Sequence, residues 1–214
     1  MDLFKFVRMK TLRKIVILLV SVVCLAHTSV FAQQLATVPN VMPLTRVLFI
    51  FDGSYSMLGI WERHSKMEVA KSILIPFIDS VSKIPNVEVG VRIYGNRSPF
   101  PPQDCKDSHL EVPFGKNNLP EIVNKILSLN PHGTTPIAYS IEQAAKDFPP
   151  DSTARNIIFL ITDGVEACDG DPCAISRKLQ EKGVILKPFI IGVGNEVDFN
   201  KMFDCAGHVF SAKN

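Results

Sequence analysis

The sequence predicts an α/β fold of the doubly wound, Rossmann-like kind: a mostly parallel sheet with one antiparallel edge strand and helices on both faces. Short apolar runs rich in β-branched and aromatic residues alternate with segments of ten or more residues that have helical periodicity, the pattern of βαβ units. The run 47–51 is wholly apolar, as expected for a strand buried on both faces of a parallel sheet, and 156–161 is predicted as another apolar strand. Right-handed crossovers would then distribute the helices over both faces.

Each predicted element has a local signal in the sequence. Ser65 and Glu68 form a capping box that opens a helix to about residue 83, and Pro76 is expected to kink or shift that helix. After the first strand at 47–51, further strands are expected at 87–94, 109–114 (the antiparallel edge), 156–161, 184–193 and 209–212. Further helices are expected at 119–129, 137–148, 171–182 and 197–205.

The first 32 residues have the parts of a secretory signal peptide. A basic segment precedes twelve mostly apolar residues, 15–26, and Val30-Phe31-Ala32 resembles a cleavage signal. This apolar segment is shorter than the ~20 residues that a membrane span needs. We therefore expect a signal peptide at 1–32, a leader at 33–44 and one domain at 45–214, exported to the periplasm, the cell surface or the medium. The alternative is an uncleaved N-terminal anchor.

The charge of the chain excludes two classes of partner. The whole chain has 23 basic and 21 acidic residues, but the predicted signal peptide carries five of the basic and one of the acidic residues. The remainder has 18 basic and 20 acidic residues, a net charge of about −2. We therefore expect no nucleic acid partner, and membrane association only through an uncleaved signal or through a partner.

Four cysteines follow the predicted cleavage site, and an even number in an exported chain favours disulfides. Four cysteines allow three pairings. The turn residues between Cys168 and Cys173 favour that pair, which would leave Cys105 with Cys205. The alternative, a zinc site, is disfavoured because the C-x₄-C spacing has no matching second pair of ligands.

Oxygen-bearing side chains gather at three predicted loops. One loop follows strand 47–51, one precedes the helix that begins after 136, and one follows strand 156–161. Ligands of open α/β sheets bind at the carboxyl ends of strands, so these side chains are expected to meet at one rim. Carboxylates and hydroxyls suit Mg²⁺, with Mn²⁺ or Ca²⁺ as alternatives. The candidate metal ligands are Asp52, Ser54, Ser56, Thr135 and Asp163.

Each of these motifs alone has an ordinary structural explanation. Asp, Ser and Gly after a strand are common turn residues, Thr134 or Thr135 could cap the next helix, and an Asp-Gly turn is commonplace. Only their combination on one rim favours a metal site. Near it, Tyr55 and the loop at 100–102 either touch a partner or pack locally, and His132 is expected to be a solvated loop residue.

The five candidate ligands resemble, in order and spacing, the metal-ion-dependent adhesion site (MIDAS) of the von Willebrand factor A (vWA) domain family. The resemblance spans about 45–212 and is similar to bacterial exported members in the runs LITDGVEACDGDPC and HGTTPIAYSI. It implies that Ser54 and Ser56 bind the metal directly and Thr135 directly or through water. The two carboxylates would act largely through waters and hydrogen bonds. Tyr55 departs from the family, which usually has a smaller residue there.

The resemblance implies a binding protein, not an enzyme. Neutral hydroxyls leave a bound ion most of its positive charge, so an open position would attract an Asp or Glu carboxylate of a protein partner. We therefore expect an exported adhesion or assembly module. The alternatives are a structural module whose metal site does not function and a metal-assisted hydrolase. Ser54 lacks the G-x-S-x-G context of a hydrolase nucleophile.

Overall fold

The computed structural model describes residues 42–61, 63–190 and 210–211. Its main strands are β1 (Thr45–Asp52), β4 (Val87–Tyr94), β5 (Ser108–Gly115), β6 (Arg155–Thr162), β7 (Val184–Ile190) and β8 (Phe210–Ser211). Its helices are α2 (Lys66–Ser82), α3 (Leu119–Leu127), α4 (Ile137–Asp147) and α5 (Pro172–Glu181). After β1 come a 3₁₀ helix, η1 (Tyr55–Leu58), and a hairpin of two short strands, β2 (Ile60–Trp61) and β3 (His64–Ser65).

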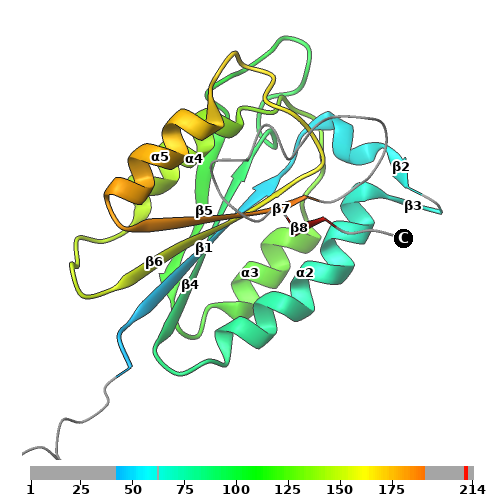
Figure 1. Cartoon of the computed structure of the whole chain (residues 1–214). Helices are drawn as coiled ribbons and strands as arrows, with labels where there is room; N and C mark the ends of the chain where they lie inside the picture. Colours follow the sequence, from blue (N-terminus) through cyan, green and yellow to red (C-terminus); the bar gives the residue numbers. More distant parts are fainter. Residues whose placement is uncertain (1–41, 62, 191–209, 212–214) are drawn as a thin grey trace, which may run out of the picture. The chain divides into compact units, whose positions relative to one another are not determined.

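The main strands form one six-stranded sheet in the order β5-β4-β1-β6-β7-β8 (Figure 1). Strand β5 pairs antiparallel with β4, and every other neighbouring pair is parallel. The predicted fold class is therefore confirmed, including its single antiparallel edge strand. The central position of β1 explains why residues 47–51 are apolar throughout.

Helices cover both faces of the sheet, with α2 and α3 on one face and α4 and α5 on the other (Figure 1). Alternate side chains of β1 enter two separate cores, because successive residues of a strand point to opposite faces. Val47, Phe49 and Phe51 belong to the core that contains residues of α2 and α3. Leu48 and Ile50 belong to the core that contains residues of α4 and α5.

Helix α2 begins at the predicted capping box. The Ser65 hydroxyl accepts the Glu68 N–H at 3.1 Å, and Glu68 Oε2 accepts the Ser65 N–H at 2.7 Å. The helix continues through Pro76 to Ser82 without a break. The preceding η1 and β2–β3 hairpin were not predicted, because elements of two to four residues are too short to show periodicity.

Several predictions concern residues outside the described part of the chain. The signal peptide at 1–32, most of the leader at 33–44, Cys205 and the helix at 197–205 lie there, as does the end of the strand at 184–193. No helix within the described part is long and apolar enough to span a bilayer.

Candidate metal centre

Backbone hydrogen bonds join the first two loops of the predicted site. The Tyr55 N–H donates to the Gly133 carbonyl at 2.9 Å, and the His132 N–H donates to the Gly53 carbonyl at 3.1 Å. Ser54 and Gly133 form a parallel bridge. The Ser54–Ser56 segment and the segment before Thr135 are therefore held side by side, although about eighty residues separate them in the sequence.

Gly95, which follows β4, is required for this arrangement. Its φ of +65° is a conformation that residues with a Cβ rarely adopt. A Cβ at this position would lie 2.3 Å from the Thr134 carbonyl oxygen and 3.0 Å from the Ser54 nitrogen. The Gly95 carbonyl also accepts the Gly133 N–H at 2.9 Å. The end of β4 thus holds the other two segments in contact.

A chain of short hydrogen bonds links two serines to the third loop. Ser54 Oγ lies 3.0 Å from Ser56 Oγ, and Ser56 Oγ donates to Asp163 Oδ1 at 2.8 Å. Because the only hydroxyl hydrogen of Ser56 is used toward Asp163, Ser54 donates to Ser56. Ser54 Oγ therefore keeps both lone pairs and Ser56 Oγ keeps one, and these are available to a cation.

Thr135 and Ser56 approach the same point. A Cβ on Gly164, which directly follows Asp163, would lie 3.7 Å from Ser56 Oγ and 4.0 Å from Thr135 Oγ1. Thr135 is buried, and its carbonyl accepts the Ala167 N–H at 3.1 Å. The structure therefore brings together residues from all three predicted loops at the carboxyl edge of the sheet.

Asp52 is fully buried and stabilises the loop that it begins. Its Oδ1 accepts the Ser54 N–H at 2.8 Å. Its Oδ2 accepts the Tyr94 hydroxyl at 2.7 Å and the Thr162 hydroxyl at 2.7 Å. Neither Tyr94 nor Thr162 was among the predicted metal ligands, although Thr162 belongs to the predicted loop after strand 156–161. Each carries a hydroxyl at the last position of an otherwise mostly apolar strand. That position could have indicated that they contribute to the rim.

The centre carries an excess of negative charge. Burial and the nearby Asp163 carboxylate raise the pKa of Asp52 from 3.8 to about 6, against the opposing effect of hydrogen bonds from Ser54 and Thr162. Burial, together with the Asp52 charge, also raises the pKa of Tyr94 well above its ordinary value. Burial is the larger cause of both shifts, but neighbouring carboxylates contribute to each, so a positive charge in this position would be favourable.

Lys66, the first residue of α2, already brings one positive charge. Its Nζ lies 2.7 Å from Asp163 Oδ2, and only 19% of its side chain is exposed, against 0% for Asp163. Lys66 was not predicted to belong to the site, because a lysine at the start of an amphipathic helix is usually solvated.

The hydroxyl geometry fits a small octahedral cation. Neighbouring ligands at the ~2.0–2.1 Å bond length of Mg²⁺ are about 3 Å apart, and the Ser54 and Ser56 oxygens are 3.0 Å apart. In the described part of the chain, no group of three or more His, Cys, Asp or Glu side chains is arranged to hold a metal. A cation at this rim would therefore depend on neutral hydroxyls as well as on the carboxylates.

His132 adjoins the centre without pointing to a catalytic role. Its Nδ1 is hydrogen-bonded to the Asn130 carbonyl of its own loop at 2.7 Å, as expected for a loop histidine.

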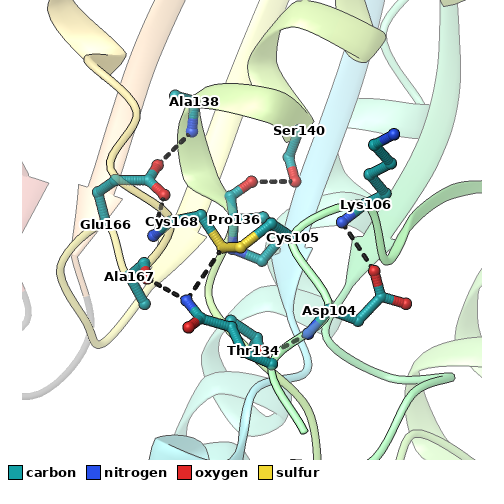
Figure 2. Close-up of a disulfide and its surroundings, with 11 residues drawn as sticks. Asp104, Cys105, Lys106, Thr134, Pro136, Ala138, Ser140, Glu166, Ala167 and Cys168 are labelled. Carbon is teal, nitrogen blue, oxygen red and sulfur yellow. Dashed lines mark hydrogen bonds between the residues drawn. A yellow bond between two sulfur atoms is a disulfide. The ribbon is translucent and has the colours of Figure 1, made fainter.

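A disulfide lies beside the centre, but not between the cysteines that were predicted to pair. Cys105 is bonded to Cys168, with their Cα atoms 5.6 Å apart at a sequence separation of 63 (Figure 2). The predictions of Cys168–Cys173 and Cys105–Cys205 pairs are therefore wrong. Cys173 is also disulfide-bonded, in the first turn of α5. Proximity in sequence misled the prediction because tertiary packing brings the loop after β4 against the loop after β6.

Hydrogen bonds around the disulfide hold the same loops together (Figure 2). The Gln103 side-chain amide donates to the Ala167 carbonyl, and the Asp104 N–H donates to Thr134 Oγ1 at 3.3 Å. The Glu166 carboxylate accepts the N–H groups of Cys168 at 2.7 Å and Ala138 at 2.6 Å. The loop after β6 is thereby fixed to the start of α4.

A cavity of about 440 Å³ lies between these loops and adjoins the candidate metal ligands. It is lined by Tyr55, Ser56, Phe100, Gln103, Gly133, Thr134, Thr135 and Ala167. Two of the candidate metal ligands, Ser56 and Thr135, therefore belong to its wall.

Comparisons with known proteins agree with this architecture. Residues 47–214 match the family model of the von Willebrand factor type A domain. The chain is 31% identical over 160 residues to the uncharacterized protein YwmD of Bacillus subtilis (strain 168), a match that covers 73% of this chain and 71% of that protein.

Solved structures show the same fold. The conserved hypothetical protein BatB from Bacteroides thetaiotaomicron has a TM-score of 0.63 and 18% identity, covering 80% of this chain and 91% of that chain. Proximal thread matrix protein 1 from the mussel byssus, solved with a zinc-occupied MIDAS motif, has a TM-score of 0.57 and 17% identity. That match covers 79% of this chain and 41% of the byssus protein.

Proposed function

Because the chain belongs to the von Willebrand factor type A domain family, we propose that it binds another protein through a divalent cation. The cation is Mg²⁺, with Mn²⁺ or Ca²⁺ as alternatives, and it bridges this domain to an Asp or Glu carboxylate of the partner. The observation that carries the proposal is the convergence of three loops at one rim, with the Ser54 and Ser56 hydroxyls 3.0 Å apart. Such spacing suits two neighbouring ligands of one small cation.

The five residues divide into two roles. Ser54, Ser56 and Thr135 hold the cation through their hydroxyl oxygens, Thr135 either directly or through water. Asp52 and Asp163 act through water and hydrogen bonds. The contacts of Asp52 support this role, because its two oxygens already accept the Ser54 N–H and the hydroxyls of Tyr94 and Thr162.

This donor set favours binding over catalysis. Hydroxyl ligands are neutral, so the bound ion keeps much of its charge and attracts an anion from outside the domain. The proposed role is therefore adhesion or assembly. With the expected signal peptide at 1–32, the domain would perform this role after export. The zinc-occupied MIDAS motif of the byssus protein supports divalent metal binding by this fold, without identifying the ion used here.

Calorimetric titration with Mg²⁺ tests the proposal. The wild-type protein should bind one equivalent, and Asp163→Ala should abolish binding while circular dichroism shows a retained fold. Asp79→Ala is a matched control, because Asp79 is an exposed carboxylate on α2 that pairs with Lys83. Its Mg²⁺ affinity should equal that of the wild type. Equal affinity in wild type and Asp163→Ala would refute the proposed site.

A second experiment tests the bridging role. The immobilised domain is incubated with an envelope extract in Mg²⁺, and bound proteins are eluted with EDTA. Under the proposal, a specific partner elutes on chelation from the wild type and is missing from the Asp163→Ala column. A partner retained equally by both columns would contradict metal bridging.

One observation favours a second candidate, a structural module that needs no ion. The Lys66 ammonium is 2.7 Å from Asp163 and supplies part of the positive charge that a metal would bring. A folded wild-type protein that binds no Mg²⁺, Mn²⁺ or Ca²⁺ would favour this candidate.

A further inference from the structure

We infer that the cavity beside the metal centre receives a large apolar side chain that neighbours the carboxylate on the same partner segment. This inference rests on the proposed function and adds the chemistry of the partner. The domain would thus recognise an acidic residue next to a large apolar one, such as Leu or Phe, rather than a carboxylate alone.

The cavity lies directly beside the candidate metal ligands. Ser56 and Thr135 belong both to the candidate ligands and to the cavity wall. A partner whose carboxylate reaches a cation at these hydroxyls must therefore place its adjacent atoms at the cavity. With a volume of about 440 Å³, the cavity has room for one large side chain.

The wall of the cavity exposes two aromatic side chains. Tyr55 and Phe100, which come from two different loops, both line the cavity and are 59% and 51% exposed. Ala167 adds a further apolar group, and no Asp, Glu, Lys or Arg is among the described residues that line the cavity. Exposed aromatic surface in a concave site is typical of ligand contact. A charged side chain would lose hydration here without gaining an oppositely charged partner among these residues.

A backbone hydrogen bond and a disulfide hold the loops that form the wall. The Phe100 N–H donates to the His132 carbonyl at 2.7 Å. This hydrogen bond holds the loop after β4, which contains Phe100, against the segment before Thr135. The Cys105–Cys168 disulfide links the same loop to the loop that contains Ala167. A preformed wall reduces the entropy that binding must overcome, so an apolar side chain entering the cavity would increase affinity.

Two short peptides test the inference. The probes are acetyl-Gly-Phe-Glu-Gly-amide and acetyl-Gly-Ser-Glu-Gly-amide, titrated into the domain in saturating Mg²⁺ and in EDTA, with binding followed by NMR chemical shifts. The Phe peptide should bind at least about tenfold more tightly than the Ser peptide in Mg²⁺, as expected for burying most of an apolar side chain. Neither peptide should bind detectably in EDTA.

Variants of the wall locate the effect. In Phe100→Ala the contact with the ring is lost. The Phe peptide should then bind about threefold more tightly than the Ser peptide, or less. Phe100→Leu should retain part of the difference between the peptides. Mg²⁺ affinity, measured without peptide, should be unchanged in both variants. Ile84→Ala is the matched control. Ile84 is 47% exposed, lies between α2 and β4 near the amino ends of the parallel strands, and does not line the cavity.

The outcomes separate this inference from the proposed function. If both peptides bind equally and only in Mg²⁺, the cavity inference is overturned while metal bridging stands. A preference for the Phe peptide that persists in Phe100→Ala also overturns it. If Mg²⁺ does not bind, or the Phe peptide binds equally in EDTA, the coupling of cavity and cation is overturned together with the proposal on which it rests.

Discussion

At the scale of single residues, the centre is defined by which partner each polar atom has. Asp52 is bound on both oxygens by groups of its own loop and of β4 and β6, so its main effect is to shape the rim. Asp163 instead connects a candidate ligand, Ser56, with the ammonium of Lys66. Lys66 therefore occupies the electrostatic position that a divalent cation would share.

Replacing Lys66 should affect metal binding and metal-free stability in opposite directions. Lys66→Met removes a positive charge near the cation, and we expect Mg²⁺ affinity to rise about tenfold or more. In EDTA the same change deprives the buried Asp163 carboxylate of its charged partner, lowering the free energy of unfolding by about 1–3 kcal/mol. Calorimetry and urea denaturation measure the two effects.

Lys83→Met is the control for this prediction, because Lys83 forms an exposed ion pair on the same helix. It should change neither quantity appreciably. If Lys66→Met weakened Mg²⁺ binding, Lys66 would be a structural support of the centre instead of a competitor.

At the scale of elements, the sequence was informative where an element is long and buried. Residues 47–51 were predicted as a strand buried on both faces and 156–161 as a further apolar strand, and they lie in β1 and β6. The capping box correctly marked the start of α2. The hairpin β2–β3 had no such signal, since strands of two residues are too short to show periodicity.

The capping box of α2 supports a prediction about stability. Ser65→Ala removes the acceptor of the Glu68 N–H and should lower the free energy of unfolding by about 1 kcal/mol. The backbone and side-chain hydrogen bonds from Ser65 hold the pKa of Glu68 below its ordinary 4.5. Because the pKa of Glu68 is lowered, the stability contributed by its ionised carboxylate is present above pH 4.5. It is lost as the pH falls through the folded-state pKa.

Comparing wild type with Glu68→Gln by urea denaturation across pH 3 to 7 measures this contribution. The wild type should be more stable near neutral pH, and the difference should shrink at the acidic end. A difference independent of pH would show that the ionised form of Glu68 contributes nothing.

At the scale of the whole molecule, the sheet order decides which loops meet. Strands β4, β1 and β6 are neighbours, so the loops after them share one rim even though they are far apart in sequence. The Cys105–Cys168 disulfide joins two of these loops. It thereby connects the wall of the cavity that carries Phe100 to the wall that carries Ala167.

Removing this disulfide should weaken the fold and, more selectively, the apolar cavity. The Cys105→Ser/Cys168→Ser double variant should lose about 2–4 kcal/mol of unfolding free energy, because the unfolded chain is no longer constrained. Its preference for the Phe peptide over the Ser peptide should decrease. Mg²⁺ affinity should change less, because the serine and carboxylate contacts do not involve these cysteines. Urea denaturation, the peptide titration and calorimetry provide the three measurements.

The sequence by itself determined the alternation of strands and helices, the buried nature of β1, and the oxygen-bearing residues at the ends of β1 and β6. Each of these depends on local composition and period, which neighbouring residues specify. Only the tertiary structure decided that Cys105 pairs with Cys168, that Lys66 reaches Asp163, and that Tyr94 and Thr162 support Asp52. Those contacts join segments that are far apart in the chain, and their geometry follows from how the sheet and helices pack together.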